Sequence, residues 1–233
     1  MYNKFMNIAG ISKISLSDYK NKVATVIFTS GCNFRCDFCH NSSLVDGNAS
    51  LVNEEEIFSY LAKRVGIIDG VVISGGEPTL QEDLIDFIKK IKQLGYEIKL
   101  DTNGSKYEVC KKLIDEKLID YVAMDIKNGP SYYSDIIKIK DIYIFNIKKT
   151  VDLLINSGID YEFRTTLVKE YFTKESILEL GNFIKGAKKL YLQKYVSREE
   201  CINSNLNEVN EKEANEYASL LKIYIDDVEL RGY

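Results

Sequence analysis

Short apolar runs rich in β-branched residues alternate along the chain with segments whose apolar residues recur every three or four positions. The runs predict buried strands, and the longer segments predict amphipathic helices packed against them. We expect strands at Val23–Thr29, Gly70–Ile73, Glu97–Asp101, Tyr121–Met124, Tyr161–Leu167 and Lys189–Gln193, and a short last strand at Val228–Leu230. We expect helices at about Glu54–Val65, Leu80–Leu94, Tyr107–Leu118, Ile147–Asn156, Lys174–Ile184 and Glu211–Ile225.

This alternation predicts an α/β fold of parallel strands with helices outside them. Six strand–helix units fall short of the eight that close a barrel of about 250 residues, so we expect a partial (β/α)6 barrel that is open laterally. A doubly wound sheet is an alternative that periodicity does not exclude. Because no linker or repeat interrupts the pattern, we expect a single domain over residues 1–233, with a core at about 20–196 and a C-terminal helix and strand at 210–231.

Composition narrows the class of protein. Hydrophobic residues at 45% and charged residues at 28% are typical of a soluble globular chain. A net charge of −4 argues against nucleic acid or an anionic membrane as a general partner. The chain has no apolar run long enough to span a bilayer, and its first residues lack the apolar core of a signal peptide. We therefore expect a cytoplasmic protein, because free cysteines stay reduced in the cytoplasm.

Three of the five cysteines lie in one loop after the first predicted strand, at Cys32, Cys36 and Cys39. This is one ligand short of the four that close an iron–sulfur cluster, so the spacing predicts a 4Fe–4S cluster with one iron open to a second ligand. A structural zinc site would need a fourth ligand. The only histidine, His40, follows Cys39 too directly to join the same tetrahedron. Five cysteines in 233 residues are also too few for a secreted disulfide framework.

A second motif, Gly75-Gly76-Glu77-Pro78, follows the second predicted strand. Its glycines would let a ligand approach the backbone, and its proline favours entry into the next helix. Exposed carbonyls and the Glu77 carboxylate would accept hydrogen bonds from an ammonium group. The alternative is an ordinary tight turn with a solvated glutamate, and the neighbouring cysteine loop favours the ligand-binding interpretation.

Oxygen ligands end the third and fourth predicted strands. Asp101, Thr102 and Asp125, with main-chain carbonyls, could hold a hard cation. Lys127 could pair with a ligand carboxylate as a point charge. In the alternative, Asp101 only caps its turn and Lys127 is a surface lysine.

The fifth predicted strand carries a polar face of Glu162, Arg164 and Thr166. A buried arginine needs an anionic partner, and for Arg164 a ligand carboxylate and a structural Glu162 are equal alternatives. Folds of this class keep their active sites at the carboxyl ends of the strands. We therefore expect these polar groups to converge there, together with Gln193 at the end of the sixth predicted strand.

Together these motifs resemble the radical S-adenosylmethionine (SAM) superfamily, over roughly residues 10 to 196. The resemblance is carried by Cys32-x3-Cys36-x2-Cys39, with Phe38 before the last cysteine, and by Gly75-Gly76-Glu77-Pro78. Within the superfamily, the chain resembles the glycyl-radical-enzyme activases in three motifs: Cys39-His40-Asn41, Asp101-Thr102-Asn103-Gly104 and Met124-Asp125-Ile126-Lys127. Three longer strings resemble the activating proteins of anaerobic ribonucleoside-triphosphate reductase: Val71–Gln81, Lys99–Ser105 and Tyr161–Thr166.

The resemblance implies that the cofactors are a 4Fe–4S cluster on the three loop cysteines and SAM, and that no catalytic side chain is needed beyond them. It implies SAM contacts at Phe38, Gly75, Gly76, Glu77, Asp101, Asn103, Lys127, Arg164 and Gln193. It also implies a monovalent cation at Asp101, Thr102 and Asp125. Related activases carry a histidine near the end of the sixth strand, where this chain has Gln193-Lys194-Tyr195. Cys110 and Cys201 are expected to be ordinary free cysteines.

The resemblance further implies reductive cleavage of SAM to a 5′-deoxyadenosyl radical, which removes a hydrogen atom from a glycine of a partner resembling anaerobic ribonucleotide reductase. A low-potential donor such as flavodoxin or ferredoxin would supply the electron. One alternative is a radical SAM enzyme acting on a small molecule or peptide, such as a deazaguanine-type synthase or a peptide maturase. Another is a non-catalytic iron–sulfur electron carrier, which would want four protein ligands and would not account for Gly75-Gly76-Glu77-Pro78.

Overall fold

A computed structural model of the protein describes residues 6–140 and 144–233. The chain forms two compact units by its backbone contacts. The first unit contains the residues up to Asn33 together with Ser43–Thr102 and Glu108–Val122. The second contains Phe34–Ser42, Asn103–Tyr107 and Ala123–Tyr233. The cysteine loop is therefore shared, with Cys32 in the first unit and Cys36 and Cys39 in the second.

The strands of the first unit follow one another in the sheet as they do along the chain: β1 (Ile8–Ser15), β2 (Ala24–Thr29), β3 (Gly70–Gly75) and β4 (Glu97–Thr102). β1 is antiparallel to β2, whereas β2, β3 and β4 are parallel. Parallel strands are covered on both faces and are therefore apolar along their whole length. Accordingly Val71, Val72 and Ile73 of β3 are all fully buried.

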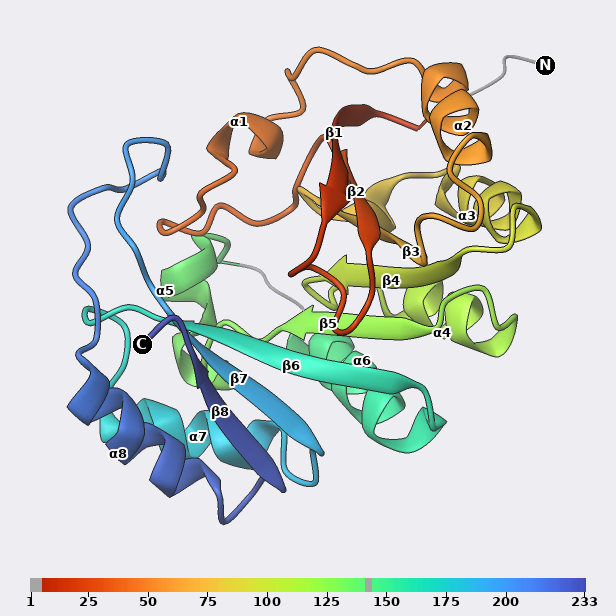
Figure 1. Ribbon diagram of the computed structural model, residues 1–233. Helices are drawn as coiled ribbons and strands as arrows, with labels where there is room; N and C mark the ends of the chain where they lie inside the picture. The colour runs from red at the N-terminus through yellow and green to blue at the C-terminus, as the bar shows by residue number, and fades with distance from the viewer. Residues whose placement is uncertain (1–5, 141–143) are drawn as a thin grey trace. The chain divides into compact units, whose positions relative to one another are not determined.

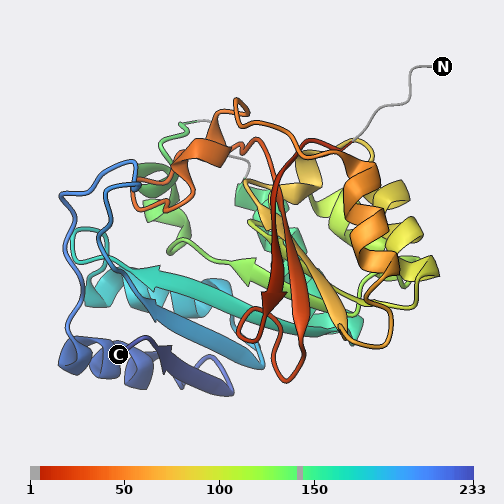
Figure 2. The ribbon, with the colours of Figure 1, turned by 45° about the horizontal axis from the view of Figure 1, so that its top comes forward.

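Helices cover these strands, and their bounds are α1 (Ser42–Val45), α2 (Glu54–Ala62), α3 (Leu84–Gln93) and α4 (Tyr107–Asp115), with a 3-10 turn η1 at Pro78–Leu80. α2 begins at Asn53, whose side chain accepts a hydrogen bond from the Glu55 N–H (2.8 Å) and caps the helix. Figures 1 and 2 show α2 and α3 side by side, and the rings of Phe58 and Phe87 meet between them with centroids 5.3 Å apart.

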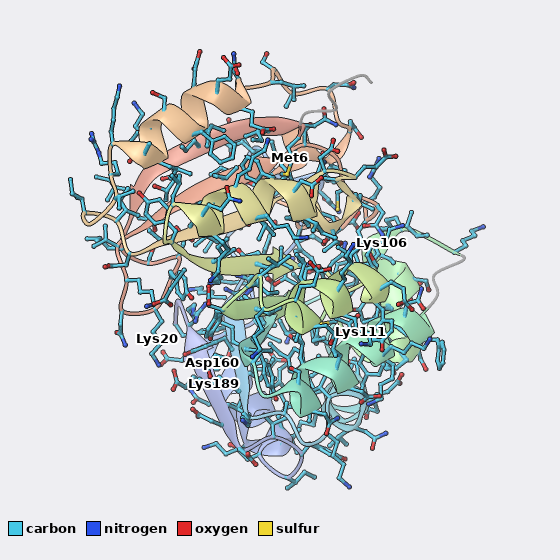
Figure 3. The ribbon with its side chains drawn as sticks, turned by 90° about the vertical axis from the view of Figure 1, so that its right-hand side faces the viewer. Met6, Lys20, Lys106, Lys111, Asp160 and Lys189 are labelled. Atoms are coloured by element: carbon cyan, nitrogen blue, oxygen red, sulfur yellow. The ribbon has the colours of Figure 1, made fainter. Side chains whose placement is uncertain are left out.

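The second unit contains three parallel strands, β6 (Asp160–Leu167), β7 (Lys189–Lys194) and β8 (Asp227–Arg231). β5 (Tyr121–Asp125) begins in the first unit and ends in the second. Asp160 and Lys189 begin β6 and β7 (Figure 3). The Lys189 ammonium also forms ion pairs with Asp227 and Glu229 of β8.

The helices of the second unit are α5 (Tyr133–Ile137), α6 (Ile144–Ser157), α7 (Lys174–Phe183) and α8 (Glu211–Leu221), with a 3-10 turn η2 at Pro130–Tyr132. α8 packs on α7 and on β8 (Figure 1). A capping box at Thr173 and Ser176 begins α7. No helix of the described residues is both long and apolar enough to cross a membrane.

The predicted α/β class, with parallel strands in an open rather than closed arrangement, is confirmed. Within the described residues β1 pairs only with β2 and β8 only with β7, so neither strand closes a ring. In each unit the strand order follows the chain order, without the reversal that defines a doubly wound sheet. Organisation as a single domain over residues 1–233 stays a prediction. The hydrophobic pattern did not predict α1, α5 or β1. In β1, a glycine and serines interrupt the apolar alternation.

Cys110 lies on the inner side of α4, in the core of the first unit, and is 1% exposed. Burial raises the pKa of its thiol to about 12, and the charge of Glu77 adds to the effect, whereas a hydrogen bond with Thr102 opposes it. The thiol is therefore protonated at neutral pH and behaves as a small apolar side chain.

We expect iodoacetamide at about pH 8 to leave Cys110 unmodified in the native apoprotein, because a pKa of about 12 leaves only about one thiol in ten thousand ionised. In urea the pKa should return to about 8.5, so that alkylation becomes faster by orders of magnitude. Mass spectrometry of the peptide containing Cys110 measures both rates. Equal rates in the two conditions would contradict this burial.

Candidate functional site

Two glycine-containing turns meet at the carboxyl ends of β2 and β3 in the first unit. The Glu77 N–H donates to the Gly31 carbonyl (2.8 Å) and the Gly76 N–H to the Thr29 carbonyl (2.9 Å). A Cβ on Gly76 would lie 2.1 Å from the Gly31 oxygen, and one on Gly75 would lie 2.3 Å from the Thr29 nitrogen. Both glycines are therefore needed for a backbone–backbone approach, which the sequence alone suggested only for a ligand.

Cys32 is the loop cysteine that belongs to the first unit, and backbone bonds hold the segment before it. The Gly31 N–H donates to the Leu44 carbonyl (2.7 Å) and the Cys32 N–H to the Val45 carbonyl (3.1 Å). The Gln81 side chain donates to the Ser30 carbonyl (2.8 Å). α1 and η1 thus fix the position at which the cysteine loop leaves β2.

Glu77 has no exposed surface, so it is not the solvated glutamate of an ordinary turn. Its Oε1 accepts hydrogen bonds from the Thr79 N–H (3.1 Å), the Thr79 hydroxyl and the Thr102 hydroxyl (2.7 Å). These bonds cap η1 and join the turn after β3 to the end of β4. A contact of Glu77 with the amino group of SAM stays a prediction.

The predicted cation ligands of the first unit have protein partners. Asp101 accepts a hydrogen bond from the Ser74 hydroxyl (3.0 Å), and its other oxygen lies 3.7 Å from the Lys99 ammonium. Thr102 donates to Glu77. Among the described residues, no three Cys, His, Asp or Glu side chains are grouped to hold a single metal ion. The cation site at Asp101, Thr102 and Asp125 stays a prediction.

The carboxyl ends of β5 and β6 bring three charges together in the second unit. Arg164 Nε lies 2.8 Å from Asp125 Oδ1, and Lys127 Nζ lies 3.2 Å from Asp125 Oδ2. Burial alone would raise the pKa of Asp125, but the charges and hydrogen bonds of Arg164 and Lys127 outweigh it and hold the pKa at about 2. Burial alone would lower the pKa of Lys127, and Asp125 reverses that effect and raises it.

These three side chains by themselves carry two positive charges and one negative charge. The Arg164 guanidinium contacts Asp125, and the buried Glu162 pairs with Arg231 (3.4 Å) of β8. A partly enclosed site with excess positive charge favours an anionic ligand group. The Lys127 side chain is 14% exposed, so it is not the surface lysine of the alternative interpretation.

The other two loop cysteines, Cys36 and Cys39, lie beside the charged side chains of Asp125, Lys127 and Arg164 in the second unit. The Cys39 N–H donates to the Cys36 carbonyl (2.9 Å) and closes a tight turn. Phe38 within that turn is 6% exposed, and the Lys127 ammonium lies 5.7 Å from the centre of its ring. Burial raises the pKa of the Cys39 thiol, and the charge of Lys127 opposes this effect. A nearby cation stabilises the thiolate that a metal requires.

The loop after β7 also contacts the cysteine loop, which the sequence did not indicate. His40 Nε2–H donates to the Val196 carbonyl (2.8 Å), and its ring stacks on Tyr195 with centroids 6.1 Å apart. Cys201 of this loop interacts electrostatically with Cys39. These contacts join residues more than 150 positions apart, and no local pattern marks such a pair.

The remaining predicted residues are placed as follows. Asn103 is 6% exposed, and its side-chain oxygen accepts a hydrogen bond from the Ser105 N–H (3.0 Å), which shapes the turn after β4. Gln193 is half-buried in β7, in register with Thr166 and Arg231. Neither placement tests a contact with SAM.

The thiol chemistry of the loop suits the cluster that the motif predicts, although in the described residues no three such side chains are grouped around a single ion. All five cysteines are free of disulfides. Cys36 and Cys39 share one turn, and the positive charge of Lys127 acts on both thiols. Thiolate sulfur is the ligand of iron–sulfur clusters. Ligation by all three cysteines stays a prediction, since Cys32 belongs to the other unit.

Comparisons with known proteins agree with these features. The family model described as "Radical SAM superfamily" matches residues 26–184. A Methanocaldococcus jannaschii protein named "Putative glycyl-radical enzyme activating enzyme" is 35% identical over 230 residues, which are 96% of this chain and 95% of that protein.

Two solved structures share the fold. A domain of pyruvate-formate lyase-activating enzyme from Bacteroides vulgatus is 18% identical, with a TM-score of 0.56 over 70% of this chain and 99% of that one. Streptococcus suis SuiB bound to S-adenosylmethionine is 16% identical, with a TM-score of 0.67 over 89% of this chain and 50% of that one. The family model and the M. jannaschii relative decide the family: the chain belongs to the radical SAM superfamily, among the glycyl-radical-enzyme activating enzymes.

Proposed function

We propose that this protein cleaves SAM reductively at a 4Fe–4S cluster and uses the 5′-deoxyadenosyl radical to remove a hydrogen atom from a glycine of anaerobic ribonucleoside-triphosphate reductase. Membership of the superfamily establishes the cluster and SAM as the cofactors. The partner and the glycine are the proposed part. A low-potential flavodoxin or ferredoxin would deliver the electron.

The observation that carries the proposal is the positive cluster of Asp125, Lys127 and Arg164 beside Cys36 and Cys39. SAM presents an α-carboxylate next to the group that would bind the open iron. Lys127 supplies a point charge for that carboxylate, while Arg164 is held in place by Asp125. With a pKa of about 2, Asp125 stays ionised at working pH and keeps both cations oriented.

When bound and reduced, the cluster supplies the electron that breaks a carbon–sulfur bond of SAM. The side chains of this chain bind and orient. Phe38 offers an apolar face beside the cysteines, and the turn containing Gly75 and Gly76 offers main-chain carbonyls. No proton transfer by a side chain is required. His40 contacts the Val196 carbonyl and the Tyr195 ring.

A macromolecular glycine as the hydrogen donor is supported by two observations. The M. jannaschii relative matches 96% of this chain and is named a "Putative glycyl-radical enzyme activating enzyme". The strings Val71–Gln81, Lys99–Ser105 and Tyr161–Thr166 resemble those of ribonucleotide reductase activators. The alternative is a small-molecule substrate, and the radical assay with the partner enzyme distinguishes it from a macromolecular glycine.

We expect the double variant Cys110→Ala/Cys201→Ala to bind about four irons after anaerobic reconstitution, as the wild type does, because Cys32, Cys36 and Cys39 suffice. The matched variant Cys36→Ala should lose most of its iron. Iron and sulfide assays measure both proteins. Substantial iron loss in the double variant would refute the three-cysteine assignment, and attention would turn to Cys201 beside Cys39.

We expect Lys127→Met to weaken SAM binding to the cluster-loaded protein by about 1.5–3 kcal/mol, because a charge-assisted hydrogen bond to the SAM carboxylate is lost. Lys169→Met removes a lysine of the same unit that pairs with Glu213, and it should leave the affinity unchanged. Anaerobic calorimetry gives both values. The assigned role of Lys127 is wrong if the two variants bind SAM equally well.

We expect a glycyl radical in anaerobic ribonucleotide reductase after it is mixed with this reduced protein and SAM. Electron paramagnetic resonance should show a doublet that collapses when the partner's glycine carries deuterium at Cα. Methionine and 5′-deoxyadenosine should form in the same mixture. Fast turnover of a free metabolite, with no radical on the partner, would refute the proposed substrate but leave the family assignment intact.

A further inference from the structure

Asp37 lies between Cys36 and Cys39 in the sequence, and neither the motif nor the resemblance assigns it a role. Its side chain is 15% exposed. The Tyr171 hydroxyl donates a hydrogen bond to Asp37 Oδ2, and the Lys138 ammonium lies 2.9 Å from the same oxygen. Lys138 also lies 5.6 Å from the centre of the Tyr171 ring. These three residues form one cluster, called here the Asp37 clamp.

The clamp joins the cysteine loop to two rigid elements of the second unit. Lys138 ends α5 in the left-handed conformation, with its N–H donating to Ser134. The Tyr171 carbonyl accepts a hydrogen bond from the Asn128 side chain (2.8 Å), and Asn128 is fully buried next to Lys127. Tyr171 is thereby connected both to the turn that holds the cysteines and to the segment that holds Lys127.

Backbone bonds reinforce the clamp on either side of Asp37. The Arg35 N–H donates to the carbonyl of Ile137 (2.9 Å), and the Asn203 N–H donates to the carbonyl of Asp37 (2.8 Å). Cys36 is therefore held between two anchored neighbours. The clamp and these bonds are formed by protein groups, and they hold the loop from both sides of Asp37.

We propose that the Asp37 clamp positions Cys36 and Cys39 for the cluster, with Asp37, Tyr171 and Lys138 acting through the loop and touching neither the cluster nor SAM. This inference rests on the proposed ligand role of the two cysteines. A preformed ligand loop loses less conformational freedom on binding a metal. Groups that orient metal ligands typically change metal affinity about 10–100-fold when removed.

The test compares Asp37→Asn and Tyr171→Phe with Tyr161→Phe as the matched control. Tyr161 belongs to the same unit and its hydroxyl also forms a hydrogen bond, accepting from the Lys188 N–H (3.0 Å), but it lies on β6. In the apoprotein, amide hydrogen exchange over residues 34–42 should become about tenfold faster in the two clamp variants and stay unchanged in the control. In the anaerobically loaded protein, iron release to a ferrous chelator should also become about tenfold faster.

Unchanged exchange over residues 34–42 in both clamp variants would overturn the proposal. Exchange that accelerates throughout the second unit would also overturn it, since the clamp would then support general stability. Faster amide exchange over residues 34–42 in the clamp variants, together with iron release at the wild-type rate, would overturn the proposal as well. Full iron retention by Cys36→Ala would instead show that the ligand assignment itself has failed, and that result needs no clamp variant.

Discussion

The contact between the Gly31 carbonyl and the turn after β3 is the constraint on which the loops at the strand ends of the first unit depend. It requires a residue without a side chain at position 76, because a Cβ there would lie 2.1 Å from that oxygen. The N–H of Glu77 then completes the contact with a hydrogen bond, and the buried carboxylate of Glu77 fixes the turn to β4. The direction in which the chain leaves β2 toward Cys32 follows from this single approach of two backbones.

The charged cluster of the second unit depends on electrostatics instead. Asp125 contacts both Lys127 and Arg164, and its partly buried carboxylate would be costly without them. The charge of Lys127 opposes the rise in pKa that burial causes at the Cys39 thiol. In the proposed function the same charge is the counter-ion of the SAM carboxylate. Structure and chemistry are thus served by the same three side chains.

The sequence predicted the parallel strands well, because β-branched runs such as Val71–Ile73 have few alternatives to burial. The sequence did not predict β1, because its pairing is antiparallel and irregular and its apolar pattern is interrupted. In the site, the motifs located the cysteines and Glu77 but not the partners of Glu77, because Thr102 arrives from another strand. The contacts of Asp37 with Tyr171, and of His40 with Val196, were equally hidden. Such long-range pairs leave no periodic signal.

The end strands β1 and β8 have a consequence for recognition. β1 has two register shifts, and the Tyr60 hydroxyl occupies the carbonyl of Lys13. β8 is only five residues long and places Asp227, Glu229 and Arg231 outward. Bulged, short and charged edges are poor templates for an added strand. These edges therefore disfavour the capture of another polypeptide by extension of the sheet, which leaves side chains and loops for recognition.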